Sequence, residues 1–483
     1  MDKLNKKSEN IIVWCCFAFF SLLFVSLCFN ENVWLDEAFT ATLVHTDFAG
    51  VIERSMADTL PPLYNILLWA TTSIFGYYIP VMKLTSVLPM ILTLILGATA
   101  VRRRFGTASS LIFMACITGM PLMLYFGVEI RMYSLGFFFA TASGVYAYEV
   151  VKDFSKKNCL LFGILSALAG YSHHFAFVAV GFVYLFMLIY YFFAARKNIR
   201  RWFMCLVVTV VLYIPCGLIT LKQLQSVSGY FTMPEVTPAL FVQYMIYPFS
   251  TGVTPVSIVL MVLVLLLVCY SVGAIVRKHP DAELHIYALA CFLVYYGVLV
   301  FGTLISKIMT ANIFVDRYLF FSTGLIALGI SVIIPRVRIR VLESYSIPAC
   351  CVVIAAVLIT TYFAQFRTEY GNSAREELSF IRENFSEGDL LYTVEFQEEL
   401  QYTIPFYALY CGIDDFTYYW DMDACLDALR QNQDSSIWLV VQDGYEISED
   451  ELSAIEKSGF KMEQAARFDF DRYGCDIYKI DHT

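Results

Sequence analysis

Long uninterrupted runs of apolar residues dominate the first three quarters of this chain. Several of these runs reach the roughly 18 to 20 residues that an α-helix needs to cross a bilayer. Of the 483 residues, 59% are hydrophobic and 16% are charged, whereas soluble domains carry about 25% charged residues. The runs also lack the period-2 and heptad patterns of a globular core. The sequence therefore predicts an α-helical multi-span membrane protein and argues against a soluble enzyme.

Charged residues divide the apolar runs into eleven predicted spans. The first span follows Lys3, Lys6 and Lys7, but no small-residue cleavage site follows it, so we interpret it as an uncleaved span and not as a signal peptide. The eleven spans are Ile11 to Phe29, Val81 to Val101, Ser109 to Gly127, Met132 to Val150, Cys159 to Tyr171, Phe175 to Ala195, Phe203 to Leu221, Val256 to Val276, Ile286 to Leu304, Tyr318 to Ile334 and Ser346 to Ala364.

A further apolar stretch, Pro62 to Tyr78, is ambiguous, and the distribution of basic residues decides its interpretation. If it does not span, 18 of the 24 basic residues before the tail lie in predicted cytoplasmic segments, in agreement with the positive-inside rule. We therefore expect residues 62–78 to form an interfacial helix within a first external loop, residues 30–80. The N-terminus is then cytoplasmic, and the chain is a multi-pass protein of the cell (plasma) membrane.

The residues after Ala364 differ from the rest in composition. Residues 365–483 contain 26 acidic and 9 basic residues, a net charge of −17, whereas residues 1–364 have a net charge of +8. This difference predicts a transmembrane domain, 1–364, followed by a small external acidic α/β domain, 365–483. An acidic domain argues against nucleic acid as a partner. The strand-like runs are Leu390 to Val394 and Ile437 to Val441, and the helical ones are Arg375 to Asn384 and Glu449 to Lys457.

Two adjacent carboxylates follow the first span, in the sequence Trp34-Leu35-Asp36-Glu37. Asp36 is the candidate general base, because a carboxylate placed near the membrane surface can take the proton of an incoming hydroxyl. Glu37 is its candidate catalytic neighbour. The alternative is that both are simply solvated at the end of a span.

Further external motifs supply cations and polar groups. Asp58 and Tyr64 flank the two prolines that start the interfacial helix. Lys83, at the outer end of the next span, can hold a phosphate or can snorkel toward water. Glu129-Ile130-Arg131-Met132-Tyr133 lies at another span boundary, with an internal Glu129–Arg131 ion pair as the alternative role.

Two more clusters lie at later span ends. His173 and His174 occupy a short outer turn, and because consecutive residues point to different faces, at most one is expected to face a shared cavity. Asp316-Arg317-Tyr318 places an arginine where it can bind phosphate through two N–H groups. The external loop Lys222 to Pro255 contains aromatic residues that we expect to stack on a sugar or cover the site, namely Tyr230, Phe231, Phe241 and Tyr244.

Taken together, these clusters predict a site for an anionic lipid head group. Lys83, Arg131 and Arg317 stand at the outer ends of different spans, where cations are costly and mark functional sites. The carboxylates Asp36 and Glu37 are expected on the same side of the membrane. The 14 cysteines show no metal-site spacing, no cofactor is identified, and the sequence leaves open whether a divalent metal takes part.

The order of these motifs resembles that of the polyprenyl-phosphate-sugar-dependent membrane glycosyltransferases of the GT-C superfamily. Within it, the chain resembles the protein O-mannosyltransferase-like (family 39-like) branch and its relatives, the lipid A aminoarabinose transferases. The matching segments are Trp34-Leu35-Asp36-Glu37-Ala38, Pro61-Pro62-Leu63-Tyr64, Lys83-Leu84-Thr85-Ser86-Val87-Leu88, Arg103-Arg104-Phe105-Gly106, Glu129-Ile130-Arg131-Met132-Tyr133, Tyr171-Ser172-His173-His174-Phe175 and Arg317-Tyr318-Leu319.

The resemblance implies a GT-C-like fold and a function. A sugar would move, with inversion, from a polyprenyl-phosphate carrier to an extracytoplasmic hydroxyl acceptor, which is a protein, a cell-wall polymer or a glycolipid. Asp36 would be the base, and Lys83, Arg131 and Arg317 would bind the donor phosphate. The sugar or acceptor pocket would comprise Asp58, Tyr64, Glu129, Tyr133, His173, His174 and Tyr318.

The chain departs from the family pattern at two positions. Leu60 stands where the family has histidine, and Lys83 stands where it has arginine. Lysine keeps the charge but loses the two-pronged geometry of arginine. The rival function is a transporter or flippase of a lipid-linked sugar, for which broken helices near the midplane and an inverted repeat would be typical. A sensor with an external domain is a third alternative.

Overall fold

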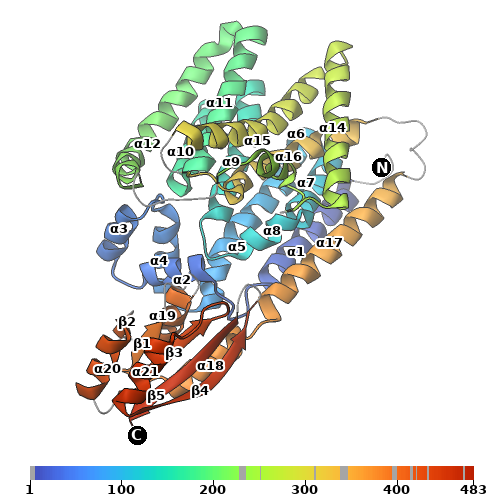
Figure 1. The fold of residues 1–483 in the computed structure, drawn as a ribbon. Helices are drawn as coiled ribbons and strands as arrows, with labels where there is room; N and C mark the ends of the chain where they lie inside the picture. The colour runs from blue at the N-terminus through green and yellow to red at the C-terminus, as the bar shows by residue number, and fades with distance from the viewer. Residues whose placement is uncertain are drawn as a thin grey trace. The chain divides into compact units, whose positions relative to one another are not determined.

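The computed structural model divides the chain into two compact units (Figure 1). Unit 1 comprises residues 1–26, 47–70 and 83–363, and unit 2 comprises residues 27–46, 71–82 and 364–483. The described residues are 6–227, 235–250, 252–308, 312–337, 346–393, 400–413, 417–419, 421–431, 435–470 and 474–482.

Unit 1 is built from helices. Helices α9, α10, α11, α15 and α16 pack side by side at its centre (Figure 1). The helices that belong wholly or mostly to unit 1 are α1 (Lys6–Ser26), α3 (Phe48–Ala57), α4 (Leu63–Phe75), α5 (Ile79–Leu96), the π-helical turn η1 (Gly97–Val101), α6 (Arg102–Phe105), α7 (Thr107–Gly119), α8 (Pro121–Val128), α9 (Tyr133–Lys152), α10 (Lys156–Ser172), α11 (His174–Ala194), η2 (Arg196–Asn198), α12 (Ile199–Val227), α13 (Pro238–Ile246), α14 (Pro255–Val276), α15 (Ala282–Ile308), η3 (Asp316–Leu319), α16 (Phe320–Ile333), η4 (Ile334–Arg336) and α17 (Ser346–Tyr370).

Every predicted span lies on one or more of these helices. Among the described residues, seven helical segments are long and apolar enough to cross a membrane, namely Lys6–Ser26, Ile79–Phe105, His174–Ala194, Arg196–Gln223, Pro255–Val276, Ala282–Ile308 and Asp316–Arg336. The span predicted for Ser109 to Gly127 is divided into α7 and α8, which meet at 67°. Pro121 begins the second piece, because proline suits a first helical turn and cannot continue the preceding helix.

Helices α9 and α10 carry two further predicted spans, although they are less apolar than the seven. Most of α9 is buried, including small and polar residues such as Ser134, Thr141, Ser143 and Gly144. A helix surrounded by other helices needs close packing and not an apolar surface toward lipid. Helix α4 covers the predicted interfacial segment and has 13 residues, about 20 Å, which is too short for a hydrocarbon core of about 30 Å.

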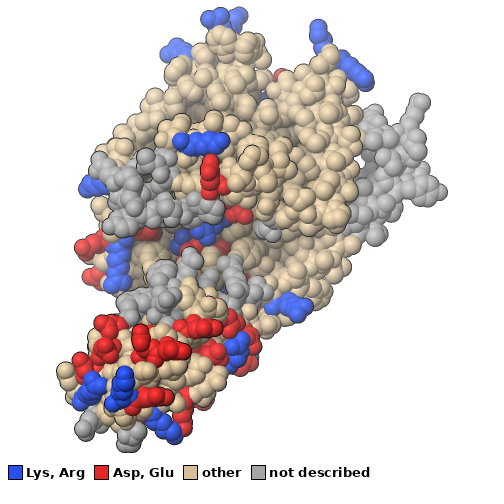
Figure 2. All heavy atoms as spheres, viewed as in Figure 1, with Lys and Arg blue, Asp and Glu red and all other residues tan. Residues whose placement is uncertain are grey.

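The outer helices of unit 1 expose apolar side chains. Helices α12 and α14 carry many of the exposed large hydrophobic residues, and Figure 2 shows broad areas over both helices without charged side chains. Such a surface is unfavourable in water and suits contact with lipid. Unit 1 therefore has the surface of a membrane domain, whereas acidic side chains gather on unit 2 (Figure 2).

Among the described residues, seven helices meet at the end of unit 1 that the sequence places at the cytoplasmic side, namely α1, α6, α7, α9, α14, α15 and η4. Glu149 of α9 accepts hydrogen bonds from Arg103 at 2.8 Å and from Arg104 Nε at 2.7 Å. Other contacts there link α1, α7, α14 and α15, namely Thr107 to Glu9, Arg336 to the Phe105 carbonyl, Tyr270 to the Arg336 carbonyl and Lys152 to Glu283. We call this group of residues the basic end of unit 1.

Unit 2 contains a five-stranded mixed sheet. Its strand order is β2-β1-β3-β5-β4, with β2, β1 and β3 parallel and the β3–β5 and β5–β4 pairs antiparallel. The elements are α2 (Leu35–Val44), α18 (Ala374–Asn384), β1 (Leu390–Thr393), α19 (Leu400–Tyr410), β2 (Thr417–Tyr419), α20 (Met422–Gln431), β3 (Ile437–Gln442), α21 (Glu449–Ser458), β4 (Phe460–Asp469) and β5 (Gly474–His482). Val394, the last residue of a predicted strand, lies outside the described residues.

Helices cover both faces of this sheet, because successive strand residues point to opposite sides. On one face Leu439 of β3 packs with Leu426 of α20 and Ile455 of α21. On the other face Trp438 packs against Phe380 of α18 at a ring distance of 5.8 Å. The C-terminal part of the chain therefore forms the predicted α/β domain, in which helices cover both faces of the sheet.

Candidate functional site

The turn between α8 and α9 carries three predicted site residues. Glu129, Arg131 and Tyr133 are 5%, 8% and 1% exposed, and the Arg131 amide donates to the Glu129 carbonyl at 2.6 Å. The turn lies at the N-terminus of α9, whereas Glu149 of the basic end lies 16 residues further along the same helix, about 24 Å away. The arginine and the glutamate are therefore buried at the opposite end of unit 1 from the basic end.

His173 lies beside this turn as the cap of helix α11. Its Nδ1 accepts a hydrogen bond from the Phe175 amide at 3.0 Å, so the ring proton of the neutral histidine lies on Nε2. Burial lowers the pKa of His173 well below its usual value, and the nearby His174, Arg131 and Arg317 lower it further. His173 is therefore a neutral N–H donor, and two arginines lie close enough to influence it.

Aromatic rings fix the position of His173. The ring stacks on Phe321 at 4.4 Å and lies 4.8 Å from Tyr318. Tyr318 stacks in turn on Phe175 at 5.0 Å. Phe321 also lies 6.0 Å from Tyr133, so these rings join the ends of α9, α11 and α16.

Asp316 and Arg317 form the first turn of η3, directly before α16. The Arg317 amide donates to Asp316 Oδ1 at 2.7 Å, so the aspartate caps this turn. Both side chains are half-buried. One end of unit 1 thus brings together charged and polar groups from separate segments of the chain. They are two arginines (Arg131 and Arg317), two carboxylates (Glu129 and Asp316) and the neutral His173.

His174 connects the site to the segment that contains Asp58. Its Nε2 lies 3.2 Å from the Thr59 carbonyl, and the Thr59 amide donates to Asp58 Oδ1 at 2.6 Å. The two histidines therefore have different neighbours: His173 lies near the two arginines, and His174 contacts the Thr59 carbonyl.

Lys83 and Tyr64 lie on neighbouring helices. Lys83 is 1% exposed in the first part of α5. The Tyr64 hydroxyl on α4 lies 2.5 Å from Ser86 Oγ, and Ser86 follows Lys83 by three residues, on the same side of a helix. Helix α4 therefore packs against the side of α5 that carries the predicted phosphate-binding lysine.

Asp36 and Glu37 belong to unit 2, in the first turn of α2. Glu37 is 4% exposed, and its Oε2 accepts from the Trp34 amide at 3.1 Å, which caps the helix. Asp36 is half-buried. The predicted site residues are thus divided between the units, with these two carboxylates in unit 2 and the cations in unit 1.

The structure adds two residues that the sequence analysis does not identify. Tyr247 is 1% exposed. Burial raises its pKa well above the usual value, and the nearby Asp316, Tyr295, Tyr133 and Glu129 add to the effect. Gln223 donates to the Leu60 and Ser55 carbonyls at 2.9 and 3.3 Å. The sequence signal for Gln223 is weak, because it is one of several polar residues that follow the apolar run, with Lys222 before it and Gln225 after it.

The aromatic loop is described in part. Tyr230 and Phe231 lie outside the described residues, whereas Phe241 is half-buried on α13. Tyr244 is buried, packs against Phe314 at 5.8 Å and accepts from the Tyr295 hydroxyl through its carbonyl at 2.6 Å. Tyr244 therefore joins α13 to α15 and to the segment before η3.

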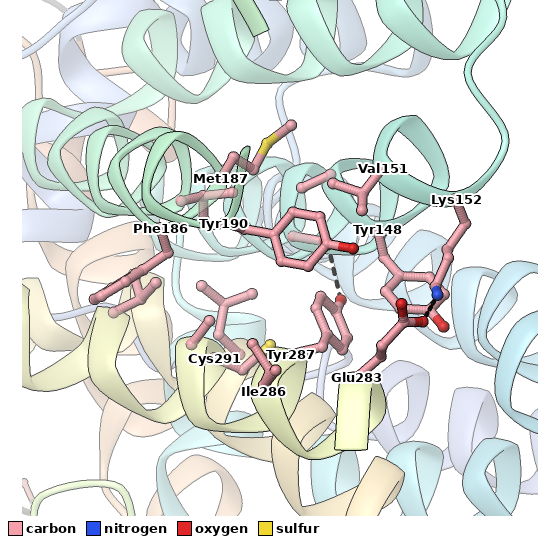
Figure 3. A pocket seen from close by; sticks show the side chains of 16 residues that line it. Tyr148, Val151, Lys152, Phe186, Met187, Tyr190, Glu283, Ile286, Tyr287 and Cys291 are labelled. Carbon is pink, nitrogen blue, oxygen red and sulfur yellow. Dashed lines mark hydrogen bonds and ion pairs between the residues drawn. The ribbon is translucent and has the colours of Figure 1, made fainter. Parts of the chain in front are cut away.

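A pocket that is partly open to the surroundings lies near the basic end (Figure 3). Its lining comes mostly from α9, α11 and α15 and is largely apolar and aromatic. Lys152 and Glu283, its charged lining residues, pair with each other, and Tyr287 donates to the Gly144 carbonyl at 2.9 Å. Nowhere in the described chain do three His, Cys, Asp or Glu side chains form a group that could hold a metal ion.

Comparisons with known proteins match the chain by structure. No protein-family model and no curated protein sequence matches it. The crystal structure of ArnT from Cupriavidus metallidurans in the apo state aligns with a TM-score of 0.62 and 14% identity, over 98% of each chain. The structure of ArnT bound to undecaprenyl phosphate aligns with a TM-score of 0.60 and 13% identity, also over 98% of each chain.

A more distant match is the archaeal oligosaccharyltransferase AglB from Archaeoglobus fulgidus. Its TM-score is 0.47 at 12% identity, over 89% of this chain and 69% of AglB. The two alignments with ArnT extend over nearly the whole chain and so include both the helical unit and the C-terminal sheet. They confirm the fold that the sequence motifs predict. The chain has the fold of these ArnT structures, with a helical domain and a small C-terminal α/β domain.

Proposed function

We propose that this protein is an inverting membrane glycosyltransferase that moves a sugar from a polyprenyl-phosphate carrier to a hydroxyl acceptor outside the cytoplasm. The observation that carries the proposal is the cluster at one end of unit 1 formed by the buried Arg131, the half-buried Arg317 and the buried neutral donor His173. A pair of guanidinium groups in a partly buried site is suited to a phosphate group.

The fold supports a lipid phosphate as the ligand of this cluster. The ArnT structure with the same fold was determined with undecaprenyl phosphate bound. We assign the phosphate of the donor to Arg131 and Arg317, with Lys83 as the third cation. Glu129, Asp58, Tyr64, Tyr133, His174 and Tyr318 would shape the pocket for the sugar or the acceptor.

The reaction is a single displacement at the anomeric carbon of the sugar. The acceptor oxygen attacks this carbon while the bond to the phosphate oxygen breaks, which inverts the configuration. Asp36 takes the proton of the acceptor hydroxyl, with Glu37 beside it. The phosphate leaves with the bonding electron pair, and the cations offset the negative charge that it gains, which stabilises the transition state.

The broken span α7–α8 does not favour a transporter. A substrate site at a broken helix needs polar groups or helix ends that face the substrate. The break consists of Gly119, Met120 and Pro121, none of which carries a polar side chain. Among the described residues of α9 and the turn before it, Glu129 and Arg131 lie at one end of the helix and Glu149 and Lys152 at the other.

The proposal is tested by transfer of sugar in a purified system. Purified protein in detergent would be incubated with a panel of polyprenyl-phosphate sugars and hydroxyl acceptors, and glycosylated product would be detected by mass spectrometry. Product from at least one donor, with free polyprenyl phosphate released in equal amount, is the expected result. Transport of intact lipid-linked sugar in proteoliposomes, without product, would replace the proposal by the transporter function.

A further inference from the structure

The segment that carries Asp36 packs with the C-terminal domain. Residues 27–46 belong to unit 2 together with residues 364–483, and helix α2 packs along helix α19. Residues more than 350 positions apart in the sequence therefore form one compact body. The C-terminal domain is the support on which the segment with the proposed base is folded.

Tyr407 of α19 makes the most direct contact with this segment. Its side chain is fully buried. The hydroxyl donates to the Glu31 carbonyl at 2.8 Å and accepts from the Val33 amide at 3.2 Å. One hydroxyl thus binds the backbone on both sides of Asn32.

These two hydrogen bonds lie immediately before the first turn of α2. Val33 is followed by Trp34, whose amide donates to Glu37 Oε2 at 3.1 Å. Asp36 lies between Trp34 and Glu37 within the same turn. The position of Asp36 therefore depends on the backbone that Tyr407 holds and on the cap that Glu37 completes.

The hydroxyl is suited to this task because it stays protonated. Burial raises the pKa of Tyr407 well above its usual value, and the nearby carboxylates Glu377, Glu37 and Glu31 raise it further, while the Val33 amide opposes them. A protonated hydroxyl can donate and accept at the same time. A phenylalanine would keep the packing and lose both bonds.

Other contacts hold the far end of α2 and the start of the segment. The Tyr77 hydroxyl donates to the Ala41 carbonyl at 2.9 Å, and Arg375 of α18 pairs with Glu31 at 3.4 Å. Neither contact reaches the residues between Asn32 and Glu37. Of these three contacts, those of Tyr407 lie nearest to the first turn of α2.

We propose that Tyr407 is a positioning residue for the transfer reaction. By fixing the Glu31 and Val33 backbone, it holds Asp36 in the geometry for proton transfer, and it makes the C-terminal domain part of the catalytic apparatus. This role rests on the proposed function of Asp36 as general base. Preorganisation of this kind matters because small displacements of a catalytic group cost large factors in rate.

The test is Tyr407→Phe in the full-length protein. We expect kcat for sugar transfer to fall about tenfold, the effect of removing a buried hydrogen bond, with the KM for the donor unchanged. Hydrogen exchange of the Val33 to Glu37 amides should become faster by a similar factor. The matched control is Tyr402→Phe on the same helix, whose ring packs on Phe39 and whose hydroxyl has no hydrogen bond among the described residues. It should leave both measurements unchanged.

A second variant separates this role from the function of Asp36. In an Asp36→Asn background, Tyr407→Phe should cause no further loss of the residual transfer, because a positioning residue acts through the group that it positions. A further tenfold loss of transfer in the Asp36→Asn background would overturn the positioning role. An unchanged kcat in Tyr407→Phe, together with faster exchange of the Val33 to Glu37 amides, would also overturn it. Unchanged amide exchange in Tyr407→Phe would show that the Tyr407 hydroxyl does not hold the backbone before α2. Full transfer by the Asp36→Asn variant alone is a different result. It would show that Asp36 is not the general base, and it would leave the hydrogen bonds of Tyr407 to the Glu31 and Val33 backbone unaffected.

Discussion

At the scale of single residues, the structure brings motifs that are far apart in the sequence together into one cluster of charged residues. Arg131 and Arg317 come from turns 186 positions apart and both influence His173. Glu129 and Asp316 lie next to Tyr247 in the same region. The cluster therefore contains carboxylates as well as guanidinium groups, and a guanidinium group buried without an opposite charge nearby would be costly.

The arginines give the first residue-scale prediction. Arg131→Ala or Arg317→Ala should weaken binding of undecaprenyl phosphate by about tenfold or more, since loss of a charge-assisted contact costs about 1.5 to 3 kcal/mol. Lys83→Arg should be tolerated, because it restores the residue of the family motif. Binding would be measured with radiolabelled undecaprenyl phosphate on purified protein in detergent.

The control for the arginine variants is Lys307→Ala. Lys307 is an exposed cation in the last turn of α15, on the same predicted side of the membrane. Its removal changes the net charge equally and should leave binding unchanged. If both arginine variants bind as the wild type does, the two arginines have a structural role only.

At the scale of elements, the sequence predicts the helices better than the sheet. Apolar runs locate α1, α5, α11, α12, α14, α15 and α16, because each run must be long enough for a bilayer. In unit 2 the strongly apolar strands β1 and β3 are predicted, whereas β2, β4 and β5 are missed. Strand β4 is mostly exposed, so its sequence carries little apolar signal.

The association of α2 with α19 could not be predicted from the sequence alone. The predicted membrane domain includes the first external loop, because the domain boundary is placed where the charge composition changes, after Ala364. Contacts such as that between Tyr407 and Glu31 join residues 376 positions apart, and local patterns carry no information on them. For the same reason the individual site residues are predicted, but their neighbours Tyr247 and Gln223 are not.

Helix α18 gives an element-scale prediction on pH. Glu377 is fully buried, and burial raises its pKa from the usual 4.5 to about 8. The folded state therefore holds a proton that the unfolded state releases above pH 4.5. The free energy of unfolding of the C-terminal domain should therefore fall between about pH 4.5 and 8. Where Glu377 is protonated in the folded state and ionised in the unfolded state, this decrease is about 1.4 kcal/mol per pH unit.

Glu377→Gln should remove this part of the pH dependence, because an amide keeps the shape of the protonated acid and does not titrate. The measurement is native-state hydrogen exchange of strand β3 at several pH values, corrected for the intrinsic exchange rate. Glu376→Gln, an exposed neighbour on the same helix, is the control and should keep the slope. An equal slope in Glu377→Gln and the wild type would show that Glu377 is charged in the folded protein.

At the scale of the whole molecule, the proposed function requires a single orientation of the protein in the membrane. The basic end of unit 1 gathers the helix ends that carry Arg103, Arg104 and Lys152. The arginine cluster lies at the other end of α9. This arrangement agrees with the alternation of spans that the positive-inside rule predicts, with the basic end cytoplasmic and the cluster external.

Orientation can be measured with introduced cysteines. Asp450→Cys on α21 should react with an impermeant maleimide applied to intact cells, because the C-terminal domain is predicted to be external. Lys156→Cys, at the exposed start of α10, should react only after the membrane is opened. The reverse pattern would place the proposed site in the cytoplasm and contradict the external acceptor.

The central claim is that Asp36 is the general base of a sugar transfer. Asp36→Asn keeps the size of the side chain but cannot accept the proton. Transfer should therefore fall by about 10²- to 10⁴-fold, while binding of the polyprenyl-phosphate donor survives. Asp47→Asn, an exposed helix cap in the same external loop, is the matched control, because asparagine also caps helices.

The decisive measurement is glycosylated product and donor binding, determined side by side for the wild type, Asp36→Asn and Asp47→Asn. The account predicts that Asp36→Asn alone loses transfer and that all three proteins bind the donor equally. Full transfer activity in Asp36→Asn would contradict the account and remove Asp36 from the mechanism.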